Sequence, residues 1–309
     1  MYNKNQIWRD IISCSLEREI KPDVSMKCHT SWKIGGNADF FCIPSHQNQL
    51  KEVLSFALNH SLPIYIIGNG TNIWVPDEGI KGLVIKIVRT IDKVEYSAKM
   101  VKAGAGILLP ALVKKATEKE LSGLEFAAHI PGTLGGAIIN NASFGSESLS
   151  EIVNEISLFD YGSGYIKTLK KEQFSFHYRG IDLGCEKFVI LGASLILSTS
   201  DRENILLKIK NVYEQRKKSQ PVNFLTAGCV FKNPEEKSAG YLIEKAGAKG
   251  LVLGDAQVST KHANFIINRG QATAGDILQL IEKIENIVEK AFGIRLEREI
   301  DFVGLPGYR

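Results

Sequence analysis

The stretch GLEFAAHIPGTLGGAIINNAS, residues 123–143, is the most informative segment of this sequence. It places four glycines and a proline in an otherwise apolar run and ends in a pair of asparagines. Glycine and proline weaken helices and strands, so an ordinary core element would not contain so many of them. Glycine is the residue that lets another group approach the backbone closely. The segment therefore predicts a close approach, either by a ligand or by a neighbouring element of the fold.

A second glycine loop, GNGTN at 68–72, follows the apolar strand predicted at 63–67. In the first stretch, Pro131-Gly132 predicts a turn and Thr133 is a candidate N-cap of a short helix. Backbone N–H groups in such loops bind anions, although an ordinary turn or a packing contact would explain either loop alone. Two such loops beside apolar strands favour a dinucleotide cradle. Neither matches GxGxxG or a Walker loop, which argues against a Rossmann or P-loop fold.

Composition sets broad limits on the protein. The chain has 309 residues, 44% hydrophobic and 23% charged, which is ordinary for a soluble globular protein of about two domains. A net charge of +4 is too weak and too dispersed to indicate nucleic acid binding. No apolar run reaches membrane-spanning length, and the start lacks the apolar core of a signal peptide. Five scattered cysteines and six histidines without metal-ligand spacing disfavour disulfides and metal sites, so we expect a cytoplasmic protein without a metal.

Helical and strand patterns alternate along the chain to about residue 200 and predict an α+β or α/β layered domain. Beyond that point an amphipathic helix at 201–221 ends in a basic stretch, which makes a plausible domain boundary. The clearest helix spans 273–293, with a capping box formed by Thr273 and Asp276 and a stop at Gly293. Helices are further predicted over 1–20, from 45 to before Pro63 and at 109–120. Strands are predicted at 63–67, 82–88, 99–106 and 188–197, a hairpin turns at 162–164, and a final strand covers 294–304.

Three further residues carry weak signals. Arg179 lies in a polar break, FHYRG, where a solvated surface charge is the simpler interpretation. Cys229 follows a glycine in TAGCVFKNP, and free cysteines are mostly small buried hydrophobes. Glu299 alternates with apolar residues and is equally explained as a solvent-facing strand carboxylate. His262 fits a packed core histidine better than a pocket residue.

Taken in order, the segments resemble the UDP-N-acetylenolpyruvoylglucosamine reductases, the flavoenzymes that make UDP-N-acetylmuramate for bacterial peptidoglycan. The similarity covers about residues 28–304, and short linkers suggest the second of the family's two types. The segments that carry it are HTSWKIGGNADF, GNGTNIWV, GLEFAAHIPGTLGGAIINNAS, FHYRG, AGCVFKNP, AGYLIEKAGAKG, VSTKHANFIIN and LEREIDFVG.

The resemblance implies an α+β fold: a two-lobed FAD-binding domain of the vanillyl-alcohol-oxidase/PCMH type, followed by a smaller α+β substrate-binding domain. We expect an N-terminal helical appendage at 1–27, the FAD-binding domain at 28–200 and the substrate-binding domain at 201–309. It also implies non-covalent FAD, NADPH as co-substrate and a UDP-sugar enolpyruvate as substrate. The residues it assigns to FAD are Gly68, Asn69, Gly70, Thr71, Asn72, Pro131, Gly132, Thr133, Gly135, Gly136 and Asn140.

The family pattern places Arg179, Cys229 and Glu299 where the catalytic arginine, proton donor and glutamate stand, and Tyr178, Lys232 and Asn233 among the substrate-binding residues. In the implied reaction, hydride reaches the β carbon of the enol ether, a fixed cation stabilises the developing negative charge, and a side chain protonates the α carbon.

Three features depart from the family. Cys229 replaces the usual serine, His129 stands where glycine is common, and the loop NASFGSE is one residue shorter than usual. A thiol is a stronger acid than an alcohol, so the donor role survives the change. Two alternatives stay open. Another flavin oxidoreductase of the same fold would not need the AGCVFKNP and LEREIDFVG segments, whose presence disfavours it. The departures would instead fit a degenerate relative that binds a cell-wall nucleotide or a partner without turnover.

Overall fold

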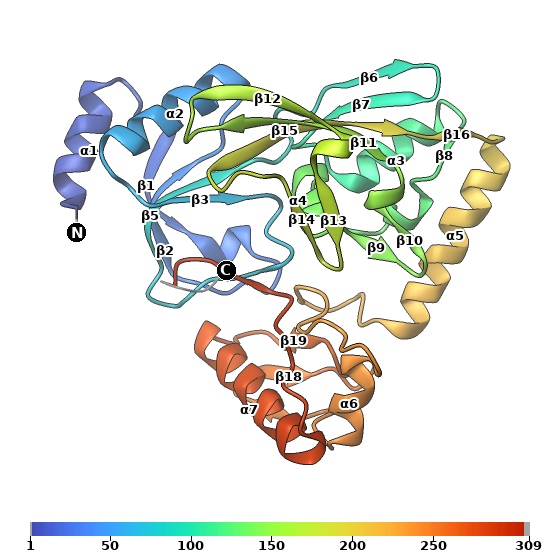
Figure 1. Cartoon of the computed structure of the whole chain (residues 1–309). Coiled ribbons are helices and arrows are strands. Elements are labelled where there is room, and N and C mark those ends of the chain that lie inside the picture. The colour runs from blue at the N-terminus through green and yellow to red at the C-terminus, as the bar shows by residue number, and fades with distance from the viewer. Residues whose placement is uncertain (1, 306–309) are drawn as a thin grey trace. The chain divides into compact units, whose positions relative to one another are not determined.

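The computed structural model describes residues 2–305 (Figure 1). The helices are α1 Lys4–Ser13, α2 Gln47–Asn59, α3 Leu109–Thr117, α4 Leu134–Ile139, α5 Arg202–Ser219, α6 Ala239–Lys245 and α7 Ala274–Phe292. The strands are β1 Ile20–Ser25, β2 Asn37–Cys42, β3 Ile64–Ile67, β4 Ile73–Trp74, β5 Ile80–Lys86, β6 Val94–Ser97, β7 Met100–Gly104, β8 Leu121–Ser122, β9 Ser143–Phe144, β10 Glu147–Ser148, β11 Val153–Asp160, β12 Tyr165–Lys170, β13 Ser175–His177, β14 Gly180–Asp182, β15 Phe188–Ile196, β16 Ser198–Thr199, β17 Val252–Leu253, β18 Ala256–Val258, β19 Ile266–Asn268 and β20 Asp301–Phe302. No helix within residues 2–305 has the length and apolar character needed to cross a bilayer.

The chain divides into two compact units. The first contains residues 2–21, 41–69 and 83–214, and the second contains 22–40, 70–82 and 215–305. The domains expected at 1–27, 28–200 and 201–309 stay a prediction, because units defined by packing and domains defined by function need not share boundaries.

The first unit contains an antiparallel sheet of order β12-β11-β15-β7-β6. Helix α4 contacts the middle strands β7 and β15 of this sheet. A parallel pair, β3 with β5, sets Ile64 opposite Leu83 in the separate four-stranded sheet of order β1-β2-β5-β3. Both β3 and β5 are rich in β-branched residues, which favour strands.

The second unit builds its core from two distant parts of the sequence. Helix α7 packs on α6, β17 and β18, and Figure 1 shows these elements together in orange and red. Trp32 and Trp74 belong to the same core, where Trp32 Nε1 donates to the Ile266 carbonyl at 2.8 Å. Trp74 Nε1 donates to the Ala274 carbonyl at 2.9 Å. Buried tryptophans need such partners for their N–H groups, so these bonds fix the N-terminal segment in the C-terminal core.

Most predicted elements are confirmed, including the hairpin of β11 and β12, the long strand β15 and the capping box of α7. Two are wrong in extent. The helix expected over 1–20 ends at Ser13, and β1 begins at Ile20. The strand expected over 294–304 is reduced to β20. Apolar and polar residues alternate in this stretch because Leu296 and Ile300 are buried. Its backbone, however, pairs with residues 230–232 through two hydrogen bonds.

Candidate functional site

In the first unit, the start of one predicted glycine loop, Gly68 and Asn69, lies against the other loop at Pro131 and Thr133. A Cβ built on Gly68 would stand 2.5 Å from Thr133 Oγ1, so only glycine fits at 68. Asn69 Nδ2 donates to the Pro131 carbonyl at 2.6 Å. Thr133 is the N-cap of α4, and its hydroxyl accepts from the Gly136 N–H at 3.3 Å. The helix cap predicted at Thr133 is confirmed.

Different contacts explain why glycine stands at each of these loop positions. Gly70 has φ +76°, and a Cβ there would stand 1.9 Å from the His29 carbonyl oxygen. A Cβ on Gly135 would stand 3.0 Å from the Ala105 Cβ, so this glycine serves the packing of α4. A Cβ on Gly136 would meet only the Thr133 hydroxyl, at 3.5 Å. The buried Thr133 hydroxyl takes the space beside Gly68, whereas Gly136 leaves its backbone open, and open backbone at the start of a helix fits a phosphate-bearing cofactor.

Arg179 stands at the tip of a hairpin in the first unit. Strands β13 and β14 pair His177 with Gly180, leaving Tyr178 and Arg179 as the two turn residues. Arg179 has φ +57°, a left-handed backbone conformation that is uncommon for residues other than glycine. Its guanidinium carbon lies 5.6 Å from the centre of the Tyr178 ring, and Tyr178 is 52% exposed.

The loop after α4 contacts this hairpin at two points. Arg179 Nη1 donates to Ser143 Oγ at 3.0 Å, and Asn141 Nδ2 donates to the His177 carbonyl at 3.2 Å. Asn140 is the C-cap of α4, and its predicted contact with the cofactor stays a prediction. Sequence reasoning missed Asn141 and Ser143, for which the asparagine pair was the only signal.

Cys229 and Glu299 are brought together in the second unit by one short segment. Val230 N donates to the Asn264 carbonyl at 2.9 Å, and Glu299 N donates to the Val230 carbonyl at 2.7 Å. The Cys229 thiol and the Glu299 side chain are both half-buried. Asn72 Nδ2 also donates to the Glu299 carbonyl, at 3.0 Å. The GNGTN loop therefore ends against the predicted catalytic glutamate, which its sequence did not indicate.

Arg216 and His262, both in the second unit, lie in the surroundings of Cys229. Burial lowers the pKa of the Arg216 guanidinium, and the negative charge of a Cys229 thiolate opposes that shift, so the two groups lie within electrostatic range. Burial also lowers the pKa of His262, whose ring packs edge-on against Phe265 with centroids 4.8 Å apart. Phe265 forms a backbone bridge with Cys229. His262 thus resembles the packed histidine expected from the sequence.

The predicted substrate-binding residues of the second unit have protein partners. Lys232 Nζ forms an ion pair with Glu297 Oε1 at 2.5 Å. Asn233 Oδ1 accepts from the Ala239 N–H at 3.0 Å, at the start of α6. Within residues 2–305, no group of three or more His, Cys, Asp or Glu side chains is arranged to hold a metal ion.

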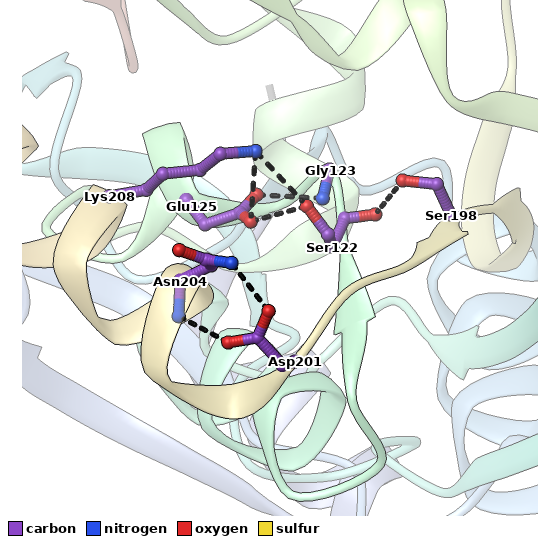
Figure 2. A network of polar contacts seen from close by, with 7 residues as sticks. All are labelled: Ser122, Gly123, Glu125, Ser198, Asp201, Asn204 and Lys208. Carbon is purple, nitrogen blue, oxygen red and sulfur yellow. Dashed lines mark hydrogen bonds and ion pairs between the residues drawn. The ribbon is translucent and has the colours of Figure 1, made fainter.

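A buried carboxylate stands at the start of the 123–143 stretch. Glu125 is 2% exposed and accepts from Ser122 Oγ at 2.6 Å and from the Gly123 N–H at 2.7 Å. Figure 2 shows Lys208, on α5, reaching toward this carboxylate, with Nζ 3.9 Å from Oε1. Ser198 Oγ donates to the Ser122 carbonyl at 3.3 Å. The network holds Gly123 at φ +120°, a conformation that favours glycine.

Comparison with known proteins identifies the family. Residues 220–303 match the C-terminal domain of UDP-N-acetylenolpyruvoylglucosamine reductase, and residues 38–170 match an FAD binding domain. The UDP-N-acetylenolpyruvoylglucosamine reductase of Desulforamulus reducens is 42% identical over 90% of this chain and 92% of its own length. The corresponding protein of Clostridioides difficile is 39% identical over 98% and 99%.

A solved structure agrees with these sequence relatives. The crystal structure of UDP-N-acetylenolpyruvylglucosamine reductase from Thermus caldophilus has 33% sequence identity and a TM-score of 0.79, and covers 92% of this chain and 98% of that one. Identity at this level over nearly the whole length of both chains confirms the resemblance and the expected α+β fold. The chain belongs to the UDP-N-acetylenolpyruvoylglucosamine reductase family.

Proposed function

We propose that this protein reduces UDP-N-acetylglucosamine enolpyruvate to UDP-N-acetylmuramate, using FAD as cofactor and NADPH as electron donor. The observation that carries the proposal is the 42% identity to a reductase of that name over nearly all of both chains. We place the reaction in the cytoplasm, where UDP-sugars and NADPH are found.

Gly68, Asn69, Thr133 and Gly136 would hold the FAD, because they combine bare backbone with hydroxyl and amide groups. When bound, FAD would supply the hydride that adds to the β carbon of the substrate. The attachment is expected to be non-covalent, so acid precipitation should release the flavin into the supernatant. Yellow colour kept in the pellet would point to covalent attachment, for which His129 is the nearest candidate in the sequence.

Arg179 would stabilise the negative charge that develops on the α carbon and the substrate carboxylate. A guanidinium can bind a carboxylate through two parallel hydrogen bonds, and it stays charged at any physiological pH. Its position at a hairpin tip beside the exposed Tyr178 ring supports this role, although the Arg179 side chain itself is half-buried. Tyr178 would contribute to substrate binding.

Cys229 would donate the proton to the α carbon, and Glu299 would polarise the same group or order its hydrogen bonds. Their adjacent backbone positions and half-buried side chains support a shared function. Lys232 and Asn233 would contribute to substrate binding. In this proposal the thiol performs the task that the family gives to a serine hydroxyl.

The purified holoprotein tests the proposal directly. We expect NADPH to bleach the flavin absorbance under anaerobic conditions, and UDP-N-acetylglucosamine enolpyruvate to restore it with formation of UDP-N-acetylmuramate. Bleaching by NADPH without recovery on adding this substrate would refute the assigned reaction while leaving flavin binding intact. A colourless protein that binds the nucleotide without turnover would favour the degenerate relative instead.

A further inference from the structure

The tip of the β13–β14 hairpin does not by itself fix the direction of the Arg179 side chain. Arg179 is a turn residue with positive φ, and its side chain has four rotatable bonds. The face of the neighbouring Tyr178 ring, 5.6 Å from the guanidinium carbon, attracts the cation without fixing its rotation. An orienting hydrogen bond must therefore come from another part of the chain.

That bond comes from Ser143, 36 residues earlier in the sequence. Strands β9 and β10 form a small hairpin in which Ser143 is paired with Ser148. The β9–β10 hairpin presents Ser143 Oγ to Arg179 Nη1 at 3.0 Å. Because β9 is tied to β10 through its backbone, the hydroxyl is a fixed acceptor.

A second contact fixes the backbone of the arginine hairpin. Asn141 donates from Nδ2 to the His177 carbonyl at 3.2 Å and accepts at Oδ1 from the Ser150 N–H at 3.1 Å. Its side chain therefore joins the strand that precedes the Tyr178–Arg179 turn to the turn of 3-10 helix at Leu149–Glu151. Asn141 holds the hairpin, and Ser143 holds the guanidinium that the hairpin carries.

We propose that Ser143 is a positioning residue that orients the Arg179 guanidinium for the reduction step. The inference rests on the role proposed above for Arg179. A serine hydroxyl suits this task because it accepts a hydrogen bond without neutralising the cation. A carboxylate in its place would form an ion pair and reduce the positive field available to the substrate.

The separation of the two half-reactions makes this inference testable. Arg179 is assigned to the step in which charge develops on the enolpyruvyl substrate, so reduction of FAD by NADPH should not depend on Ser143. In the holoenzyme, Ser143→Ala is expected to slow reoxidation of the flavin by the enolpyruvyl substrate about tenfold, the effect expected for loss of one charge-assisted hydrogen bond. FAD reduction by NADPH should stay at the wild-type rate.

Two variants control for simple damage to the loop. Ser143→Thr keeps the hydroxyl and should restore most of the lost rate. Ser148→Ala removes a hydroxyl from the same hairpin that bonds to the Ser150 hydroxyl, at 2.7 Å, and should leave both half-reactions unchanged. A folded, yellow Ser143→Ala protein that reoxidises at the wild-type rate would overturn the inference, as would an equal loss in both half-reactions.

A double-mutant cycle decides whether Ser143 acts through Arg179. If it does, Ser143→Ala should cost much less in an Arg179→Lys background than in the wild type, because the oriented group is already altered. Equal losses in both backgrounds would contradict the inference. If Arg179→Lys slows reoxidation and Ser143→Ala does not, the role of Ser143 is rejected and the role of Arg179 stands. Wild-type reoxidation by Arg179→Lys would reject the role of Arg179 and with it the inference.

Discussion

At the residue scale, the surroundings of Cys229 bear on its proposed role as proton donor. Its thiol is half-buried, the next residue is held by hydrogen bonds to two separate segments, and Arg216 lies within electrostatic range. The half-buried thiol is compatible with the proton-donor role proposed above, and variants at this position test that role.

The Cys229 variants separate donation from packing. Cys229→Ser is expected to keep substantial reductase activity because a hydroxyl can donate from the same place, whereas Cys229→Ala should lose most of it. Both should bind FAD and be reduced by NADPH at normal rates, since that half-reaction needs no proton from this residue. Stopped-flow measurement of flavin absorbance in each half-reaction checks this. Normal turnover by a folded Cys229→Ala protein would leave only the packing role.

A thiol reagent gives an independent check of the same residue. We expect it to inactivate the wild-type protein, bound substrate to slow the attack, and Cys229→Ser to resist. Cys14 and Cys28 are exposed and will also react, so inactivation that persists in Cys229→Ser would be due to another thiol.

Glu125 and Lys208 form an unequal ion pair. Glu125 is buried and makes two short hydrogen bonds, while the Lys208 side chain is 58% exposed. Lys208→Met should lower the free energy of unfolding by about 1 kcal/mol or less, because the ammonium is exposed to solvent, lies 3.9 Å from Oε1 and is screened there. Glu125→Ala should lower it by about 3 kcal/mol, because the Ser122 hydroxyl and the Gly123 N–H lose their acceptor. Urea denaturation of both variants measures the two losses in unfolding free energy, and equal losses would contradict this account.

At the scale of elements, α4 places two consecutive glycines on different surfaces. Gly135 faces the Ala105 methyl group, whereas the position of a Cβ on Gly136 meets only the Thr133 hydroxyl among the described residues. The helix therefore packs through one glycine and leaves space at the other. That space is what a bound cofactor would require.

Alanine substitutions in α4 test this difference. Gly136→Ala should leave the apoprotein as stable as the wild type or slightly more so, because alanine favours helix by about 1 kcal/mol. It should nevertheless weaken FAD binding by tenfold or more if the cofactor uses the open space. Gly135→Ala should mainly lower stability, since its Cβ would crowd Ala105 at 3.0 Å. Fluorescence titration with FAD and thermal unfolding of the apoprotein distinguish the two. Unchanged FAD affinity in Gly136→Ala would remove this glycine from the proposed site.

At the scale of the whole molecule, the half-buried His262 and the buried Cys42 are expected to limit the pH range of stability. Burial lowers the pKa of His262 from its usual 6.5, so the folded state prefers the neutral ring. The stability this contributes is present above pH 6.5 and is lost as pH falls below it. Burial raises the pKa of the Cys42 thiol from 9.0 to about 12, so its contribution is present below pH 9 and is lost at higher pH.

The unfolding free energy should therefore be highest between about pH 6.5 and 9, from the two unfolded-state pKa values. His262→Gln should reduce the loss between pH 7.5 and 5.5, a range in which Asp160, whose pKa is held low by its bond to Lys167, stays charged. Cys42→Ala should reduce the loss above pH 9, although its absolute stability will be lower. Urea denaturation across this range provides the measurement. Parallel curves for wild type and His262→Gln would show that other groups cause the acid loss.

Features that depend on short-range chemistry were predictable from the sequence. The capping box of Thr273 with Asp276, the stop at Gly293 and the cap at Thr133 each involve residues within a turn or two of one another. Hydrophobic periodicity likewise located α2, α3, α5 and α7, because one face of each segment must be buried. The quoted motifs, in their order, also identified the family and the cofactor, since the ensemble is specific although each piece is weak.

Tertiary structure alone decided which segments meet. The 294–304 stretch alternates like a strand but pairs only briefly, because strand length depends on a partner that the stretch does not encode. Trp32 joins a core formed 234 residues later, through its bond to Ile266. Ser143 meets Arg179 because two hairpins converge, and no local propensity distinguishes that serine from any other. Such contacts depend on how whole elements bury their apolar faces, so they become visible only once the chain has folded.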